Sequence, residues 1–184
     1  EGHQKTASAL YSHAEGYLNV ASGYKYYAEG DQTSETDTAA HAEGGSTVAS
    51  SVYSHAEGFQ TTATNHHAHA DGRKTLTSGM GSHTEGYFTT ASGNYSHAEG
   101  QYSVALGSYS HAGGQYSIAS GTAQTVLGQY NKEGNTDSLF VVGVGGHAGD
   151  RTDAFLVNSG STGYSVRVGT DSDTRLIVNE AGNV

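Results

Sequence analysis

The sequence has no cysteine, no proline and no tryptophan in 184 residues. Without cysteine, the chain can form neither a disulfide framework nor a zinc site with thiolate ligands. Large apolar side chains are also scarce, since Leu, Ile, Val and Phe together supply only 27 residues. That share lies below the level of about 20% under which strongly charged chains are suspected of disorder. An ordinary globular core is therefore not expected.

Basic residues are few as well, with 8 Lys and Arg and a formal net charge of −10. Nothing forms a basic stripe for nucleic acid or an anionic membrane, and we expect neither partner. No run approaches the roughly 18 apolar residues of a membrane span, so direct membrane contact is not expected. The chain opens on Glu1 and Gly2 without Met or an apolar leader. We expect it to be part of a longer protein, with any secretion signal or anchor outside it.

What the sequence does contain is an unbroken period of 14 residues, marked by glycine. Repeats of this kind decide the fold before any local pattern does. We interpret the glycines as turn residues that supply a positive φ or a close backbone approach. After Gly2 they are Gly16, Gly30, Gly44, Gly58, Gly72, Gly86, Gly100, Gly114 and Gly128.

A histidine stands three residues before most of these glycines, and an acidic residue stands one before. The histidines are His13, His41, His55, His69, His83, His97 and His111, with Tyr27 and Thr125 as exceptions. The glutamates that we group with them are Glu15, Glu43, Glu57, Glu85 and Glu99.

Halfway through the period stands a weaker copy of the unit, such as SVALG at 103–107 and SIASG at 117–121. Glycines at the half-period, such as Gly93, Gly107 and Gly121, together with those at each full period, exclude a coiled coil. Strand, turn, strand, turn fits instead, which is one coil of a β-solenoid whose coils stack about 4.8 Å apart. We predict an all-β fold in which a parallel β-roll of about nine 14-residue coils spans residues 1–130.

Alanines such as Ala14, Ala56 and Ala98 would face the interior of this roll, and His and Glu would share its outer face. Burying alanine contributes little, whereas ordering each residue costs about 1 to 2 kcal/mol of backbone entropy. A single roll should be marginally stable. We therefore expect copies of the chain to pack against each other.

The stretch SVALGSYSHAGGQYSIASG at 103–121 resembles the head repeat of YadA-like trimeric autotransporter adhesins, a left-handed parallel β-roll. The SHAEG variant, running into TAQTVLGQYN at 122–131, is similar to repeats in tail-fibre and tail-spike proteins of phages and prophages. The resemblance implies a homotrimer that is extracellular, on a virion tail or a bacterial cell surface. It also implies attachment to a host surface glycan or protein receptor, and it calls for no cofactor.

Two interpretations of the His and Glu positions remain open. We favour a structural ladder, in which imidazoles donate hydrogen bonds to carboxylates and each side chain packs on its copies in neighbouring coils. The alternative is zinc binding by HHAHAD at 66–71, where His67, His69 and Asp71 would share one strand face.

Regular recurrence argues against catalysis, because a catalytic site is normally a single constellation. We expect a non-enzymatic shaft or head for adhesion, the alternative being the scaffold of a polysaccharide-degrading tail spike. Departures from the repeat often mark surface protrusions where ligands bind. One such departure contains Glu35 and Asp37. Another contains Arg73, Lys74 and Met80, which we take as a candidate ligand patch on an otherwise acidic rod.

The composition changes after residue 130: Leu, Ile, Val and Phe supply 14 of the last 54 residues against 13 of the first 130. Strands are predicted at 138–144, 153–158, 164–169 and 175–179. We interpret residues 131–184 as a small antiparallel β-element that caps the solenoid or connects it to a neighbouring part.

Overall fold

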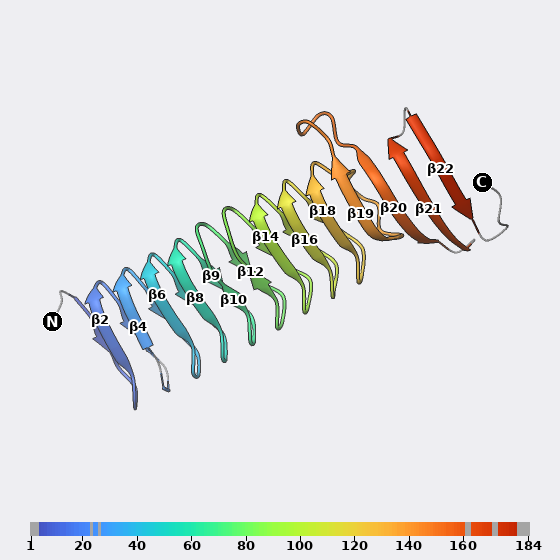
Figure 1. Cartoon of the computed structure of the whole chain (residues 1–184). Helices are drawn as coiled ribbons and strands as arrows, with labels where there is room; N and C mark the ends of the chain where they lie inside the picture. The colour runs from blue at the N-terminus through green and yellow to red at the C-terminus, as the bar shows by residue number, and fades with distance from the viewer. Residues whose placement is uncertain (1–3, 23, 26, 161–162, 171–172, 180–184) are drawn as a thin grey trace.

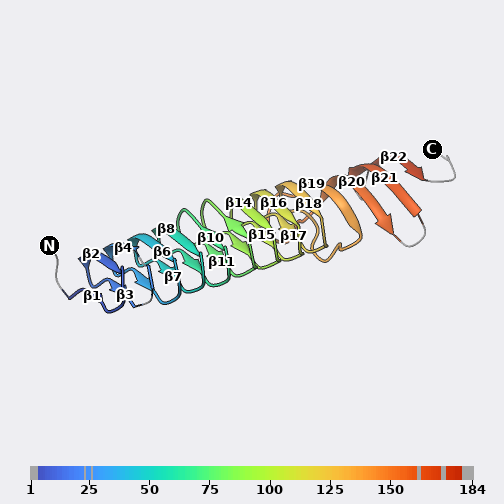
Figure 2. The same cartoon turned by 90° about the horizontal axis from the view of Figure 1, so that it is seen from below.

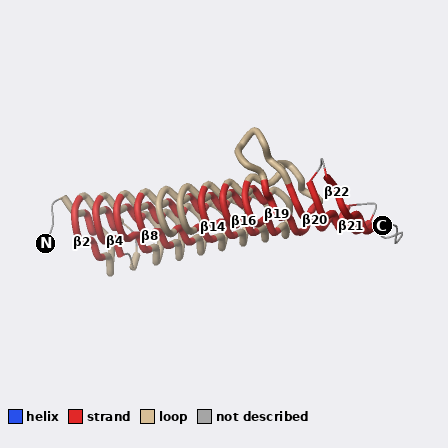
Figure 3. The backbone as a smooth tube through the Cα atoms, turned by 45° about the horizontal axis from the view of Figure 1, so that its top comes forward, coloured by secondary structure: helices blue, strands red, loops and turns tan. Residues whose placement is uncertain are grey.

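The computed structural model describes residues 4–22, 24–25, 27–160, 163–170 and 173–179. These residues form an elongated rod of strands and turns, without a helix, along which the chain advances from β2 to β22 (Figure 1). Strands and turns alternate in every coil (Figure 3). Residues 1–3, at the start of the predicted roll, and residues 180–184, at the end of the predicted C-terminal element, lie outside the described residues.

Each coil contributes one strand to each of two sheets, which lie on opposite sides of the rod (Figure 2). The narrow sheet consists of two-residue strands: β1 (Thr6–Ala7), β3 (Val20–Ala21), β5 (Ser34–Glu35), β7 (Val48–Ala49), β9 (Thr62–Ala63), β11 (Leu76–Thr77), β13 (Thr90–Ala91), β15 (Val104–Ala105) and β17 (Ile118–Ala119).

The wide sheet takes the longer strand of most coils. Its members in the roll are β2 (His13–Tyr17), β4 (Tyr27–Asp31), β6 (His41–Gly45), β8 (His55–Phe59), β10 (His69–Ala70), β12 (His83–Thr84), β14 (His97–Gln101), β16 (His111–Gln115) and β18 (Thr125–Gln129). The exceptions in length are the two-residue β10 and β12. Neighbouring strands are parallel and in repeat register, so that His97 lies opposite His111 and Gly100 opposite Gly114. The prediction of an all-β parallel solenoid with 14-residue coils is confirmed.

Two residues per coil adopt the left-handed conformation and turn the chain. One follows the long strand and the other follows the short strand, with φ between 42° and 65°. The first series is Leu18, Gln32, Ser46, Gln60, Lys74, Phe88, Tyr102, Tyr116 and Tyr130; the second is Tyr11, Lys25, Ala39, Tyr53, His67, Gly81, Tyr95, Tyr109 and Ala123. From Lys25 onward, the backbone N–H of each donates to the preceding coil, as from Gln60 to the Gly45 carbonyl at 2.7 Å.

Glycine is required where successive coils come closest. Gly100 has φ +93°, and a Cβ placed on it would lie 2.2 Å from the Gly114 carbonyl oxygen. Any side chain there would force the two coils apart, because real Cβ contacts are never this short. The repeating glycine therefore permits the close stacking of the coils.

Alanine fills the interior from both sheets. Ala56, Ala63, Ala98 and Ala105 are fully buried, as are their equivalents in most coils. Polar residues close the interior at the corners: Ser54 and Ser96, for example, donate hydrogen bonds to the carbonyls of Ser51 and Gly93 at 2.6 and 2.7 Å. These two serine hydroxyls thus satisfy backbone acceptors that the turns leave open.

Glu35 breaks this pattern, since it occupies an inward position that is alanine in the neighbouring coils and is 0% exposed. The Ala42 backbone N–H donates to one carboxyl oxygen, and the other oxygen has no hydrogen-bond partner among the described residues. Burial raises the pKa of Glu35 to about 7. The prediction that Glu35 marks a surface protrusion is wrong, because a one-for-one exchange leaves the period intact and puts the side chain inside.

The C-terminal strands extend the wide sheet. They are β19 (Ser138–Val144), β20 (Asp153–Gly160), β21 (Gly163–Thr170) and β22 (Asp173–Asn179). β19 pairs in parallel with β18, and the next three pair antiparallel in sequence order. The predicted antiparallel element is therefore continuous with the roll through one parallel pair.

Candidate functional site

The predicted ladder positions lie on the outer face of the wide sheet. His97 and Glu99 alternate along β14 with Ala98, which points inward and is fully buried. The outward side chains are partly exposed, for example 33% for His55 and 41% for Glu57. The alternation thus separates a dry alanine interior from a continuous His and Glu surface.

The histidine rings form one stacked column along this surface. From His41 to His111, successive ring centroids lie 4.6 to 4.9 Å apart with interplanar angles of 4° to 14°. Tyr27 continues the column toward the N-terminus, stacked on His13 and edge-on to His41. The ring spacing matches the separation of neighbouring strands, because every ring comes from the same position in its coil.

Burial and neighbouring imidazoles shift the titration of two rings in the column. Burial is the main cause that lowers the pKa of His55, and the neighbours His69 and His41 lower it further. The same causes lower the pKa of His83, with His69 and His97 as its neighbours. Stacked imidazoles thus resist being charged together.

The glutamates pair with the histidines in two ways. Near the N-terminus the pair lies within one strand, with His13 Nε2 3.4 Å from Glu15 and His55 Nε2 3.5 Å from Glu57. Near the C-terminal end of the roll each histidine instead faces the glutamate of the preceding coil, as His111 faces Glu99 at 3.2 Å.

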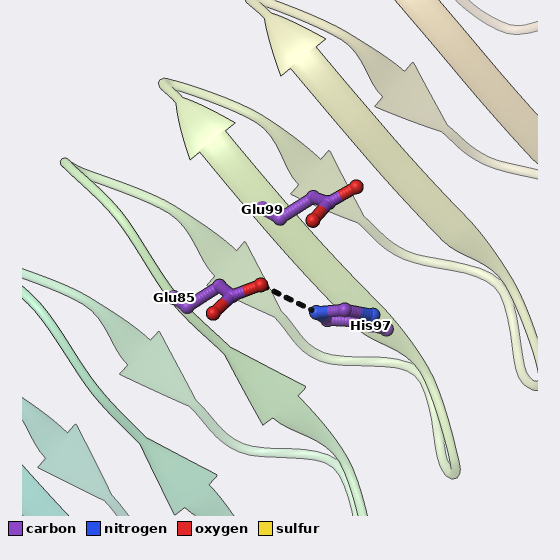
Figure 4. A group of neighbouring side chains, drawn as sticks. All are labelled: Glu85, His97 and Glu99. Carbon is purple, nitrogen blue, oxygen red and sulfur yellow. Dashed lines mark ion pairs between the residues drawn. The ribbon is translucent and has the colours of Figure 1, made fainter.

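This second arrangement brings Glu85, His97 and Glu99 together (Figure 4). One ligand atom of each lies within 4.8 Å of the other two, and this is the one such group of His, Asp and Glu in the described part of the chain. His97 Nε2 lies 3.7 Å from a Glu85 oxygen; the atom is shielded from solvent and has no hydrogen-bond partner among the described residues. All three side chains are half-buried.

The alternative metal candidates, His67, His69 and Asp71, do not share a strand face. His67 lies in the turn before β10 with φ 56°, and its ring stacks on Tyr53 with centroids 5.2 Å apart. His69 stands in β10 within the histidine column. His67 lies off this strand face because it turns the corner, whereas side chains alternate between faces only along an extended backbone.

The candidate ligand patch divides into two parts. The Arg73 guanidinium lies 5.8 Å from the Phe59 ring centroid and 5.4 Å from that of Tyr87, and Lys74 Nζ lies 4.7 Å from Phe88. Both cations are exposed and rest on aromatic rings. Met80 stands half a coil further along the chain, in the turn beyond β11.

An aromatic column that the sequence reasoning missed lies along the first series of left-handed residues. The rings of Phe88, Tyr102, Tyr116 and Tyr130 stack with centroids 4.6 to 5.0 Å apart and angles of 9° to 13°. Lys74 covers the first ring, and the Arg151 guanidinium lies 5.7 Å from the last. The column therefore presents ring edges outward. The signal was available, since these residues also recur every 14 positions.

No family model matches the sequence, and no curated protein matches it either. The described part of the chain contains no helix that is long and apolar enough to cross a membrane.

Proposed function

We propose that this protein is a non-enzymatic attachment module, a rigid left-handed β-roll that works as an extracellular homotrimer on a phage tail or a bacterial surface. The observation that carries the proposal is the in-register stacking of coils, which repeats the same outward side chains at each step of the rod. A stiff array of equivalent contacts strengthens weak binding through multivalency. Host surface glycans and protein receptors, which are themselves repeated, are partners of the right kind.

Three copies would pack through the narrow sheet. Its outward positions carry a column of mainly β-branched and aliphatic residues, and the partly exposed ones include Val20 at 36% and Leu76 at 40%. The wide sheet carries His and Glu at the corresponding outward positions, which are costly to bury between copies. Burial of the Val, Leu and Ile side chains in this column, and of the Thr methyl groups between them, would add the stability that an alanine interior does not provide.

The particle mass tests the assembly, measured by light scattering coupled to size exclusion. We expect the mass of three chains for the native sequence and a single-chain mass for the double variant Val48→Lys/Leu76→Lys, because charged side chains resist burial in an apolar contact. The matched control Glu57→Lys, on the wide sheet, should keep the trimer mass. A native chain that is monomeric at all concentrations would contradict the trimer.

Attachment itself is tested by binding of the labelled rod to candidate host cells and to purified surface polysaccharide. We expect retention that falls steeply when the trimer is dissociated by the narrow-sheet variant, since avidity is lost. Release of sugar products during the incubation would favour the scaffold of a polysaccharide-degrading tail spike over a purely binding role.

A further inference from the structure

We propose that Glu85, His97 and Glu99 form a binding site for a divalent transition-series cation of the zinc class. This site is distinct from the His67, His69 and Asp71 candidate. It does not depend on the attachment role, and it rests on the geometry of one place on the wide sheet.

The first argument is the donor set. One imidazole nitrogen and two carboxylate oxygens lie within 4.8 Å of one another. Zinc accepts these ligands with bonds of about 2.0 to 2.2 Å, and catalytic-type zinc sites need only three protein ligands beside a water. Calcium and magnesium prefer oxygen alone, so the imidazole selects against them. Two carboxylates also balance the charge of one divalent cation.

The second argument is the spacing between His97 and Glu85. Their facing atoms are 3.7 Å apart, which is too long for a hydrogen bond. Two ligands of a tetrahedral zinc ion lie about 3.4 Å apart, given the bond lengths above. A small rotation of either side chain therefore accommodates an ion between them. His97 Nε2, like the Nε2 atoms of His41, His55 and His69, is shielded from solvent and has no hydrogen-bond partner among the described residues, and an ion would provide one here.

The third argument is the support around the group. Glu99 is within 3.2 Å of His111 Nε2 in the next coil, so a second imidazole orients the carboxylate as outer-shell groups do in metal sites. The residue opposite Glu99 in that coil is Gly113, so His111 has no glutamate in its own strand that would compete with Glu99 for its imidazole. His97 itself is held by stacking between His83 and His111 at 4.9 Å on each side.

Other coils carry similar residues but lack this combination. Around His55, for example, the carboxylate in contact is Glu57 of the same strand, and His111 has Gly113 where its own glutamate would stand. We therefore expect zinc to bind with a stoichiometry of one ion per chain at the tightest site, with any weaker binding elsewhere on the ladder.

Calorimetric titration of the intact chain with zinc chloride tests this assignment. We expect one saturable event near neutral pH, and loss of affinity by about 100-fold or more in His97→Ala, Glu85→Gln and Glu99→Gln. Calcium chloride should give no heat. The matched control His13→Ala removes a stacked, glutamate-paired histidine at the far end of the column and should leave the zinc affinity unchanged.

Two further measurements distinguish the loss of a zinc ligand from misfolding of the variant. Circular dichroism should show the same β-spectrum for Glu85→Gln as for the native chain, because Glu85 is at the surface. Zinc should raise the melting temperature of the native chain and His13→Ala but not that of Glu85→Gln. The proposal is overturned if zinc produces no saturable heat, or if His97→Ala and Glu85→Gln bind zinc as the native chain does.

Discussion

His97 Nε2 lies 3.7 Å from a carboxylate oxygen of Glu85 in the preceding coil, whereas His55 Nε2 lies 3.5 Å from Glu57 in its own strand. The same HAEG motif therefore supports two pairing patterns. Glutamates such as Glu57 and Glu85 have a histidine in their own strand and another in the next coil. Because these pairs are partly exposed, either choice contributes little to stability, and the column can exchange partners at small cost.

Glycine at the coil contact should tolerate no side chain. We expect Gly100→Ala to lower the free energy of unfolding by about 3 kcal/mol or more, because its Cβ would meet the Gly114 carbonyl oxygen at 2.2 Å. Gly134→Ala is the matched control: Gly134 has φ +73° but open space around a Cβ, so a loss of about 1 kcal/mol is expected. If denaturant titrations gave the same loss of unfolding free energy for both variants, the positive φ alone, and not the close contact between coils, would explain the repeating glycine.

Glu35 should make the protein less stable as the pH rises from 4.5 to about 7. Its folded pKa of about 7 lies above the ordinary value of 4.5, so the unfolded chain releases the proton first. The contribution of Glu35 is complete below pH 4.5 and declines until the folded carboxyl ionises near pH 7. The isosteric variant Glu35→Gln should lose this dependence and gain stability over the native chain across that window. A constant difference between the two chains would contradict the assigned burial.

The histidine column should respond to pH in the opposite direction. Burial and neighbouring rings lower the folded pKa of His55 and His83 below the ordinary 6.5, so the unfolded chain binds protons first as the pH falls. Stability is therefore lost on acidification below 6.5. We expect the double variant His55→Gln/His83→Gln to show a smaller fall in melting temperature between about pH 7.5 and 5. The comparison is best made with Glu35→Gln present in both proteins, because this removes the opposing titration of Glu35. If the melting temperatures of the two proteins then fall equally with pH, the prediction is wrong.

Left-handed corner residues should differ according to what their side chains contact. Gln60 has φ 56°, which costs an L-residue about 1 kcal/mol, so Gln60→Gly should be neutral or stabilising by up to that amount. Tyr102 has φ 55° but stacks between Phe88 and Tyr116, and Tyr102→Gly should be destabilising by about 1 to 3 kcal/mol. Similar effects on unfolding by denaturant would mean that the aromatic column contributes no stability.

The period, the coil and the parallel stacking could all be predicted from the sequence, because glycine and alanine at fixed spacing leave few other folds. The left-handed corners could not be located in this way. They are occupied by residues as different as Ser46, Gln60 and Tyr102, since the inter-coil backbone hydrogen bond, rather than the side chain, holds the conformation.

The candidate site was less predictable than the fold. Spacing identifies which residues share a strand, but it does not show that Glu85 turns toward the next coil while Glu57 stays with its own histidine. That difference depends on side-chain rotation. The same reasoning placed His67 on a strand and Glu35 on the surface, because it treated each departure from the repeat as a local event rather than as an exchange within an intact coil.

The contact between each repeating glycine and the next carbonyl also governs how such a rod can change length over evolution. Copies of YSHAEG at 11–16, 53–58 and 95–100 are identical in sequence, and recombination between their coding segments would remove or add whole coils. Every such event preserves the glycine contacts and the cross-section. A half-coil change would bring side chains against the carbonyls. The length of the rod can thus vary in whole-coil steps while its surface chemistry stays the same.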